Sequence, residues 1–140
     1  MAAVMSFGWM TAAQAQTAER TYENGPVWQI SYVETKPGMS DEYLAYVNGP
    51  YRALQQAAMK RGDVIGFHTL QVDSPRDHEP DIILIIEFKN MGALDRSLGE
   101  LDKDTVAVFG STPKSNQAAV KREDIRILRG GLSARELVAK

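Results

Sequence analysis

Residues 81–89 read Asp81-Ile82-Ile83-Leu84-Ile85-Ile86-Glu87-Phe88-Lys89, and this stretch decides how the rest of the chain folds. Five consecutive positions are aliphatic and four of them are β-branched isoleucine, which is typical of a strand covered on both faces. Such a strand belongs in the middle of a sheet, with helices against one face and another layer against the other. The central question is therefore what covers the second face.

Three further stretches show strand patterns. Residues 27–34 alternate in polarity and place Trp28 and Tyr32 on the same face. Residues 64–73 form a second strand, joined to the central one by a polar loop with a proline at each end. Residues 125–129 form the last strand, which a pair of glycines closes. The sequence thus predicts four strands.

The helical signals lie between these strands. Residues 40–61 carry one apolar stripe with steps of three and four, and we expect Ser40 to cap their start. Pro50 interrupts the stripe without changing its phase, which predicts a single bent helix. Asn90 is expected to cap a second helical stretch, and Thr112-Pro113 begins a further short helix because proline suits the first helical position.

The order of elements is therefore β-α-β-β-α-β, with a second crossover enlarged to about three short helical pieces. This order predicts an α+β, ferredoxin-like domain, in which an antiparallel four-stranded sheet carries its helices on one face. An apolar sheet face left bare on the other side is unusual for a monomer. A two-fold homodimer that packs sheet on sheet would remove this face from water.

The N-terminal region reads as a targeting segment followed by a linker. Residues 1–18 contain no charged side chain, and Ala13-Gln14-Ala15 matches a signal-peptidase site, so residues 1–15 are interpreted as a signal peptide. A typical signal peptide carries a Lys or Arg before its apolar run, and none is present here. We expect a flexible lead-in over residues 16–26, the domain over 27–131 and a C-terminal tail over 132–140, either a short strand or a docked segment. The expected location is periplasmic or secreted.

Composition excludes several classes of function. The chain has 140 residues, of which 44% are hydrophobic and 24% charged, and its formal net charge is −2. One domain is expected at this length. Nucleic-acid binding is not expected because Lys and Arg form no basic patch. The short N-terminal apolar run predicts no stable membrane insertion after signal cleavage, and the absence of cysteine excludes disulfides and thiolate chemistry.

Three stretches resemble the dimeric α/β-barrel superfamily. They are Lys36-Pro37-Gly38-Met39 before the first helix, Lys60-Arg61-Gly62 before the second strand, and residues 80–91, whose strand-to-helix junction is similar to that of exported members. The superfamily includes antibiotic-biosynthesis-type monooxygenases, muconolactone isomerases and chlorite-dismutase-like haem proteins. The resemblance implies a dimeric barrel fold for residues 27–129. It implies no catalytic residue, because the superfamily has no shared active site.

Candidate catalytic residues come from the chain's own pattern. His68 lies within a strand and is either a general base or metal contact or a hydrogen-bonded core histidine. Glu87 shares a face with Ile83 and Ile85, and either pairs with His68 or an arginine or emerges at the end of the sheet beside Lys89. His78, between two acids in the polar loop, is a weak metal-ligand pattern and more typical of a solvated loop. We predict His68 and Glu87 as the catalytic pair, with no metal and no cofactor.

The predicted ligand contacts are Trp28, Tyr32 and Phe67, which could line an aromatic pocket, and Arg126. Aromatic side chains on strands more often form plain core, and Tyr43, Tyr46 and Tyr51 on the bent helix are open to the same two interpretations. Two function classes follow. The first is an exported protein that binds a small apolar or aromatic ligand in a sheet-lined dimer pocket. The second is a cofactor-independent monooxygenase or isomerase that acts on a small aromatic compound.

Overall fold

The computed structural model describes residues 19–140. The predicted signal peptide, residues 1–15, and the first residues of the predicted lead-in lie outside this range. The elements follow the order β1 (Tyr22–Thr35), α1 (Ser40–Tyr46), η1 (Val47–Tyr51), α2 (Arg52–Arg61), β2 (Val64–Gln71), β3 (Ile82–Phe88), η2 (Met91–Leu94), α3 (Leu98–Phe109), α4 (Thr112–Arg122) and β4 (Arg126–Ala139). This is the predicted β-α-β-β-α-β order, with η2, α3 and α4 forming the enlarged second crossover.

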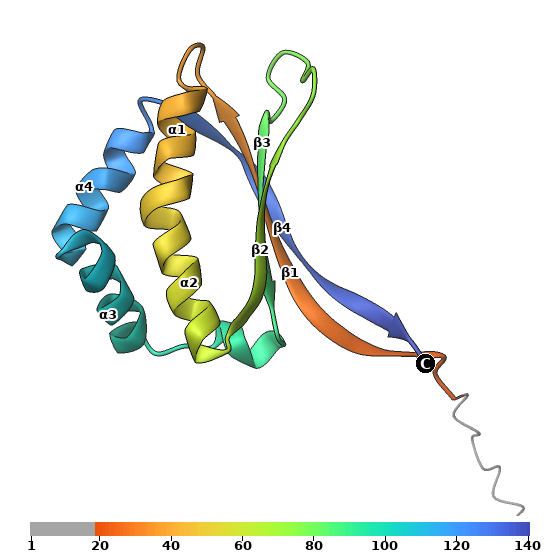
Figure 1. Ribbon diagram of the computed structural model, residues 1–140. Coiled ribbons are helices and arrows are strands. Elements are labelled where there is room, and N and C mark those ends of the chain that lie inside the picture. The colour runs from red at the N-terminus through yellow and green to blue at the C-terminus, as the bar shows by residue number, and fades with distance from the viewer. Residues whose placement is uncertain (1–18) are drawn as a thin grey trace, which may run out of the picture.

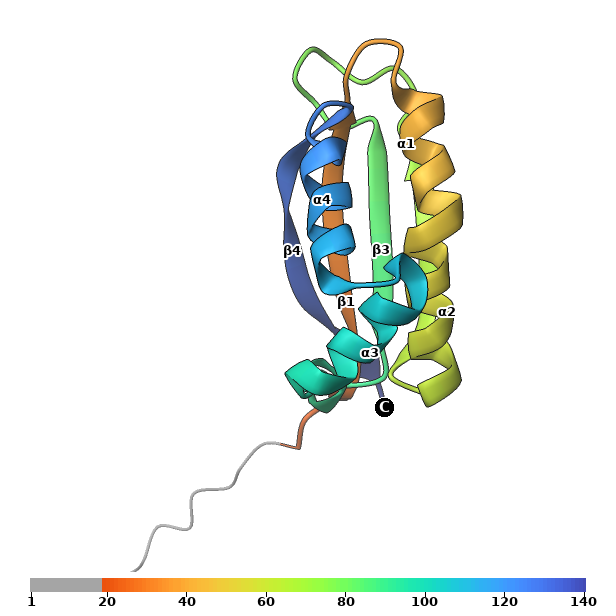
Figure 2. The ribbon, with the colours of Figure 1, turned by 90° about the vertical axis from the view of Figure 1, so that its left-hand side faces the viewer.

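The four strands form a single antiparallel sheet with the order β2-β3-β1-β4. The isoleucine-rich strand β3 is central, as predicted, with β1 beside it. All the helices lie on one face of the sheet (Figure 1, Figure 2). The predicted α+β, ferredoxin-like architecture is therefore confirmed.

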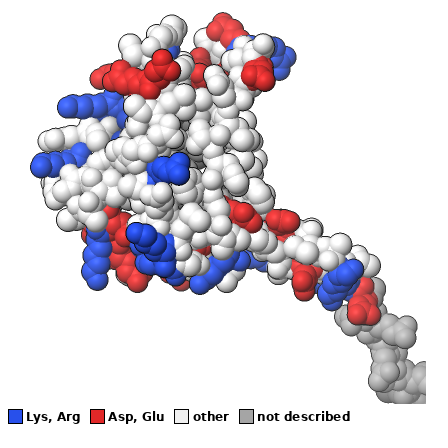
Figure 3. Space-filling model, in the orientation of Figure 1, with Lys and Arg blue, Asp and Glu red and all other residues white. Residues whose placement is uncertain are grey.

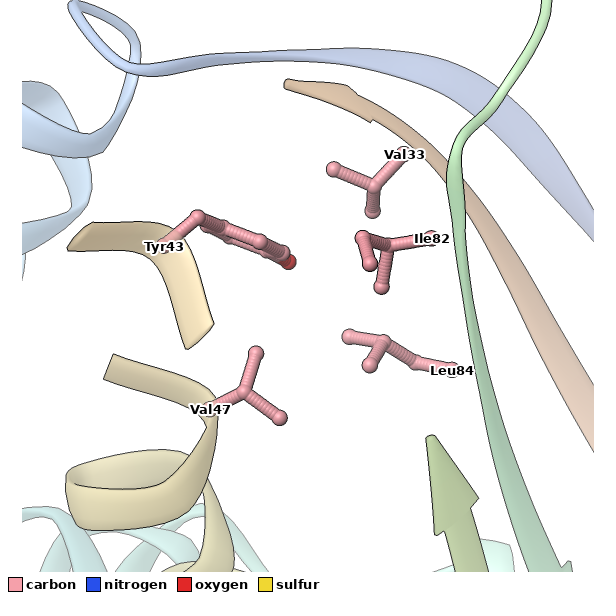
Figure 4. Packing of buried hydrophobic residues seen from close by; sticks show 5 residues of the cluster. All are labelled: Val33, Tyr43, Val47, Ile82 and Leu84. Carbon is pink, nitrogen blue, oxygen red and sulfur yellow. The ribbon is translucent and has the colours of Figure 1, made fainter. Parts of the chain in front are cut away.

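The core lies between the sheet and the bent helix. Val33, Ile82 and Leu84 from β1 and β3 meet Tyr43 and Val47 from the helix, and all five side chains are buried (Figure 4). Val33 and Ile82 are direct partners across the two strands, so they occupy the same face. Burying an aliphatic side chain of this size stabilises a fold by about 1.5–3 kcal/mol. This cluster fixes α1 and η1 against β1 and β3.

Helices α1 and α2 form one bent helix, as the stripe across Pro50 predicts. Pro50 lies in the π-helical turn η1, where a wider turn accommodates a residue that donates no backbone hydrogen bond. The helix ends at Gly62, whose φ of 79° favours glycine. The prediction that Ser40 caps the start is wrong, because Ser40 already lies within α1 and its hydroxyl is 2.7 Å from that of Thr35.

The first and the last strand extend beyond the boundaries predicted for the domain. β1 begins at Tyr22, so residues 22–26 are strand and not a flexible lead-in. β4 continues to Ala139, so residues 132–139 form the second half of this strand; of the two alternatives for the tail, the strand is correct and the docked segment is not. Tyr22 pairs with Ala139, and the two strand ends form a two-stranded extension that projects from the body (Figure 1). Each segment is ordered as a strand because the other supplies its hydrogen bonds.

The opposite face of the sheet carries no element of residues 19–140 (Figure 1). The strand registers place the following side chains on it: Trp28, Ile30, Tyr32, Leu70, Ile83, Ile85 and Leu132. We call this surface the open face. Charged groups gather mainly at the two ends of the molecule and on the extension, while the flank between them is largely uncharged (Figure 3). No helix within residues 19–140 combines the length and hydropathy needed to span a membrane.

Candidate functional site

His68 and Glu87 come together on the open face. Gly66 pairs with Glu87 across β2 and β3, and His68 follows two positions later on the same face. A methyl group placed on Gly66 would lie 3.1 Å from Glu87 Oε2 and 3.7 Å from His68 Nε2. Both polar atoms therefore converge over the space that the missing side chain of Gly66 leaves. The two side chains therefore lie near each other, without a hydrogen bond or ion pair between them, and their catalytic role stays a prediction.

Trp28 and Tyr32 lie on the same face as this pair. Trp28 pairs with Glu87 across β1 and β3, and its indole Nε1 donates a 2.9 Å hydrogen bond to Glu136 Oε2 on β4. Tyr32 lies four residues along β1, opposite Ile83. Both of these predicted ligand contacts therefore share the open face with the predicted catalytic pair, but only Trp28 lies directly beside Glu87.

Phe67 and Arg126 lie on the other face, so the prediction of one aromatic pocket is wrong. Phe67 pairs with Ile86, whose side chain faces the helices, and the ring lies 6.0 Å from the guanidinium of Arg52 on α2. Arg126 pairs with Thr35 and lies 6.0 Å from the ring of Tyr43. Alternation along a strand gives the relative faces of its residues, but it does not show which face the helices cover.

Neither histidine is a core residue in the described chain. His68 is exposed on the edge strand β2, so the expectation that it lies on a buried element is wrong. His78 is also exposed, and its Nδ1 lies 3.3 Å from the guanidinium of Arg129, which pairs with Glu34. No group of three or more His, Asp or Glu side chains within residues 19–140 is arranged to hold a metal ion.

A second set of functional side chains gathers on the helix face. Tyr43, Tyr46 and Tyr51 from the bent helix face Arg122 at the end of α4 and Arg126 at the start of β4. These five residues, with Ser31, Val33, Leu84 and Leu128, line a cavity of about 140 Å³, which we call the tyrosine–arginine pocket. The guanidinium of Arg122 lies 4.1 Å from the centre of the Tyr46 ring, a stacking geometry that holds its plane in place.

Several polar atoms of this pocket have no hydrogen-bond partner within residues 19–140. They are the hydroxyl of Tyr51, one terminal nitrogen of Arg122, and Nε and Nη1 of Arg126. Arg126 is only 8% exposed, and its one ion pair joins Nη2 to Glu123 Oε1 at 3.2 Å. Buried donors in folded proteins are nearly always satisfied, because each unmade hydrogen bond costs about 1–3 kcal/mol. The residues that carry these four atoms all line the same cavity, so a polar group bound there would have several donors close by.

Burial keeps the phenols of this pocket protonated. Removal from water raises the pKa of Tyr43 to about 12, although the nearby cation of Arg126 partly opposes this effect. Burial also raises the pKa of Tyr51 above its ordinary value, and the neighbouring Tyr43 and Tyr46 add to the shift. The Tyr51 hydroxyl is therefore a hydrogen-bond donor across the neutral pH range.

An apolar cavity of about 310 Å³ lies further along the same face, between α2, the sheet, η2 and α3. Its walls include Leu54, Ala58, Val64, Ile86, Phe88, Ala93, Leu94 and Leu101. Arg96 and Asp104 border it and belong to a ring of charges. In this ring Arg61 lies 2.8 Å and Arg96 3.1 Å from Asp104, and both arginines lie within 3.5 Å of Asp63. These pairs tie α3 to the end of α2 and so hold the cavity open.

Sequence reasoning identified Arg126 and weighed the three tyrosines, but it missed Arg122 and the apolar cavity. The one available signal for the pocket was a charged residue, Arg126, beside two aliphatic ones in the last strand. Arg122 precedes that strand on a different element, and only the packing of α4 brings it to Tyr46. The cavity depends on the spacing between α3 and the sheet, which no local pattern records.

Comparison with known proteins supports the fold alone. No family model and no curated protein matches the chain. Among solved structures, the chain is similar to the crystal structure of HapK from Hahella chejuensis, with a TM-score of 0.50 and 11% sequence identity. The match covers 81% of this chain and 95% of HapK. An identity this low shows a shared α+β architecture and carries no activity from one protein to the other.

Proposed function

We propose that the chain binds a small apolar or aromatic molecule in the apolar cavity on the helix face. The observation that carries the proposal is a space of about 310 Å³ with mainly aliphatic walls and two charged side chains at its border. Ligand pockets in proteins commonly measure about 300–1,000 Å³ and are lined by apolar side chains with a few fixed polar groups. The size suits a bicyclic aromatic molecule.

The neutral fluorescent probe N-phenyl-1-naphthylamine tests this proposal. We expect its emission to rise and saturate when the full chain is added, because the probe leaves water for the cavity. Leu101→Trp fills part of the cavity and should weaken binding at least tenfold. Leu98→Trp is the matched control on the same helix, since Leu98 is 78% exposed and does not border the cavity. Equal binding by both variants would place the probe elsewhere and refute the proposal.

The open face supports a second part of the proposal, namely self-association. Helices cover only one side of the sheet, and the side chains left on the other are largely aromatic and aliphatic (Figure 1). A second copy packed sheet on sheet would cover them, and Trp28 and Tyr32 would then lie inside the dimer.

The proposal of export rests on residues 1–15 alone. A mature N-terminus at Gln16 in a periplasmic extract would support it, and an intact chain found only in the cytoplasmic fraction would contradict it.

The convergence of His68 and Glu87 over Gly66 favours one alternative function. An imidazole beside a carboxylate can act as a general base when a covering layer excludes water. A cofactor-independent isomerase or monooxygenase acting on a small aromatic compound is therefore the second candidate. Exchange of deuterium into 2-tetralone, an enolisable bicyclic ketone, checks it by NMR. Exchange above the buffer rate that His68→Gln abolishes supports proton transfer, whereas exchange unchanged by the substitution rules out His68 as the base.

A further inference from the structure

We infer that the tyrosine–arginine pocket binds the carboxylate of an amphiphilic ligand whose apolar body occupies the neighbouring apolar cavity. This inference rests on the proposed function for the ligand's body. It adds the chemical class of the ligand, an aromatic or aliphatic monocarboxylate, and it assigns the head group to Tyr51, Arg122 and Arg126.

The first argument is the set of buried donors. Tyr51, Arg122 and Arg126 all line one cavity, and together they carry four buried donor atoms without a hydrogen-bond partner within residues 19–140. All four belong to donor groups, since the guanidinium has no acceptor and the Tyr51 phenol stays protonated. A group made only of acceptors satisfies such a set, and an ionised carboxylate is such a group. Its two oxygens match the fork of a guanidinium.

The second argument is charge. Arg122 and Arg126 bring two positive charges to the pocket, and Glu123 offsets part of this charge through its ion pair with Arg126. The remaining excess is about one unit, which suits a monoanion better than a phosphate dianion. The volume of about 140 Å³ also suits a carboxylate and its first carbon atoms.

The third argument is the position of the two spaces along the same face. Leu84 borders the tyrosine–arginine pocket and Ile86 borders the apolar cavity, and these residues are successive helix-facing positions of β3. They are separated by about 7 Å along the strand. On the bent helix, Tyr51 borders the first space and Leu54 the second, about 5 Å apart along the axis. The two spaces are therefore neighbours on the helix face, at a spacing that the length of one small molecule can span.

Calorimetric titration with a matched pair of compounds tests the inference. 2-Naphthoate and 2-naphthamide share a body and differ in the charge of the head group. We expect the full chain to bind the carboxylate at least tenfold more tightly. Arg126→Met should remove this preference without weakening the amide, and Arg122→Gln is a second variant in a less buried position. Arg129→Met is the control, because Arg129 pairs with Glu34 on the open face and should leave the preference intact.

A titration with acetate, followed through the Arg Nε–Hε NMR signals, separates this inference from the proposed function. Saturable shifts of the Arg122 and Arg126 signals support the anion site even if neither naphthalene compound binds, in which case only the proposed function fails. Binding of both compounds with equal affinity would overturn the inference and leave the proposed function standing. A preference for the carboxylate that survives both Arg126→Met and Arg122→Gln would overturn it as well.

Discussion

Replacing Arg126 with methionine should stabilise the ligand-free chain, although arginine-to-apolar changes usually affect more than one interaction. The substitution removes two buried nitrogens, Nε and Nη1, which have no partner within residues 19–140. Because the two nitrogens belong to one guanidinium, we count its burial once, and its relief should stabilise the fold by about 1–3 kcal/mol. The opposing losses are small. The ion pair with Glu123, whose side chain is 60% exposed, contributes about 0–1 kcal/mol, and the contact with the Tyr43 ring about 0.5–1 kcal/mol.

The net expectation is a gain of about 1 kcal/mol in the free energy of unfolding, or a rise of about 4 °C in the thermal midpoint. Urea denaturation and thermal melts of the two chains measure it. Arg129→Met is the control on the same strand, and it should be neutral or slightly destabilising because the Arg129 side chain is 33% exposed and paired. A loss of more than about 1 kcal/mol in Arg126→Met would show that the arginine serves the fold, and the reasoning about unpartnered donors would be refuted.

Four other substitutions test the placement of single residues. Leu84→Asp should unfold the chain, because Leu84 lies in the core and an unpaired buried carboxylate costs several kcal/mol. Ile85→Asp on the open face should keep the fold and abolish only self-association. Circular dichroism and sedimentation check both variants. At alkaline pH the unfolded chain releases the Tyr43 proton near pH 10 and the folded chain near pH 12. Tyr43 therefore contributes about 3 kcal/mol of stability below pH 10 that is lost by pH 12. Tyr43→Phe should lack this loss, which urea titrations at pH 9 and 11.5 measure. His68→Gln should change the free energy of unfolding by less than about 0.5 kcal/mol because the side chain is exposed, and a larger loss would make His68 a packing residue.

The architecture could be predicted from the sequence because its signals are local. The isoleucine run of β3, the stripe that keeps its phase across Pro50 and the proline at the start of α4 each act within a few residues. The strand ends could not be predicted in the same way. Tyr22 and Ala139 have no strong strand pattern of their own, and each is extended because it pairs with the other across 117 positions of sequence.

The candidate sites depend even more on tertiary structure. The strand registers place His68 and Glu87 near each other beside Gly66, while their catalytic role stays a prediction. The grouping of Phe67 with Trp28 and Tyr32 was wrong, because alternation does not identify the face that the helices cover. The tyrosine–arginine pocket combines residues from the bent helix, α4 and β4. Its defining property is a set of buried donor atoms without hydrogen-bond partners among residues 19–140, and such a set exists only once the chain has packed.

The central claim is that ligand binds on the helix face of the sheet and not on the open face. Intermolecular NOEs between unlabelled 2-naphthamide and the ¹³C-labelled methyl groups of the full chain test it directly, because methyl groups line both faces. The account predicts contacts to Leu54, Val64 and Leu101, which border the apolar cavity. Contacts to Ile30, Ile83 and Ile85 on the open face, with none to the cavity methyl groups, would contradict it.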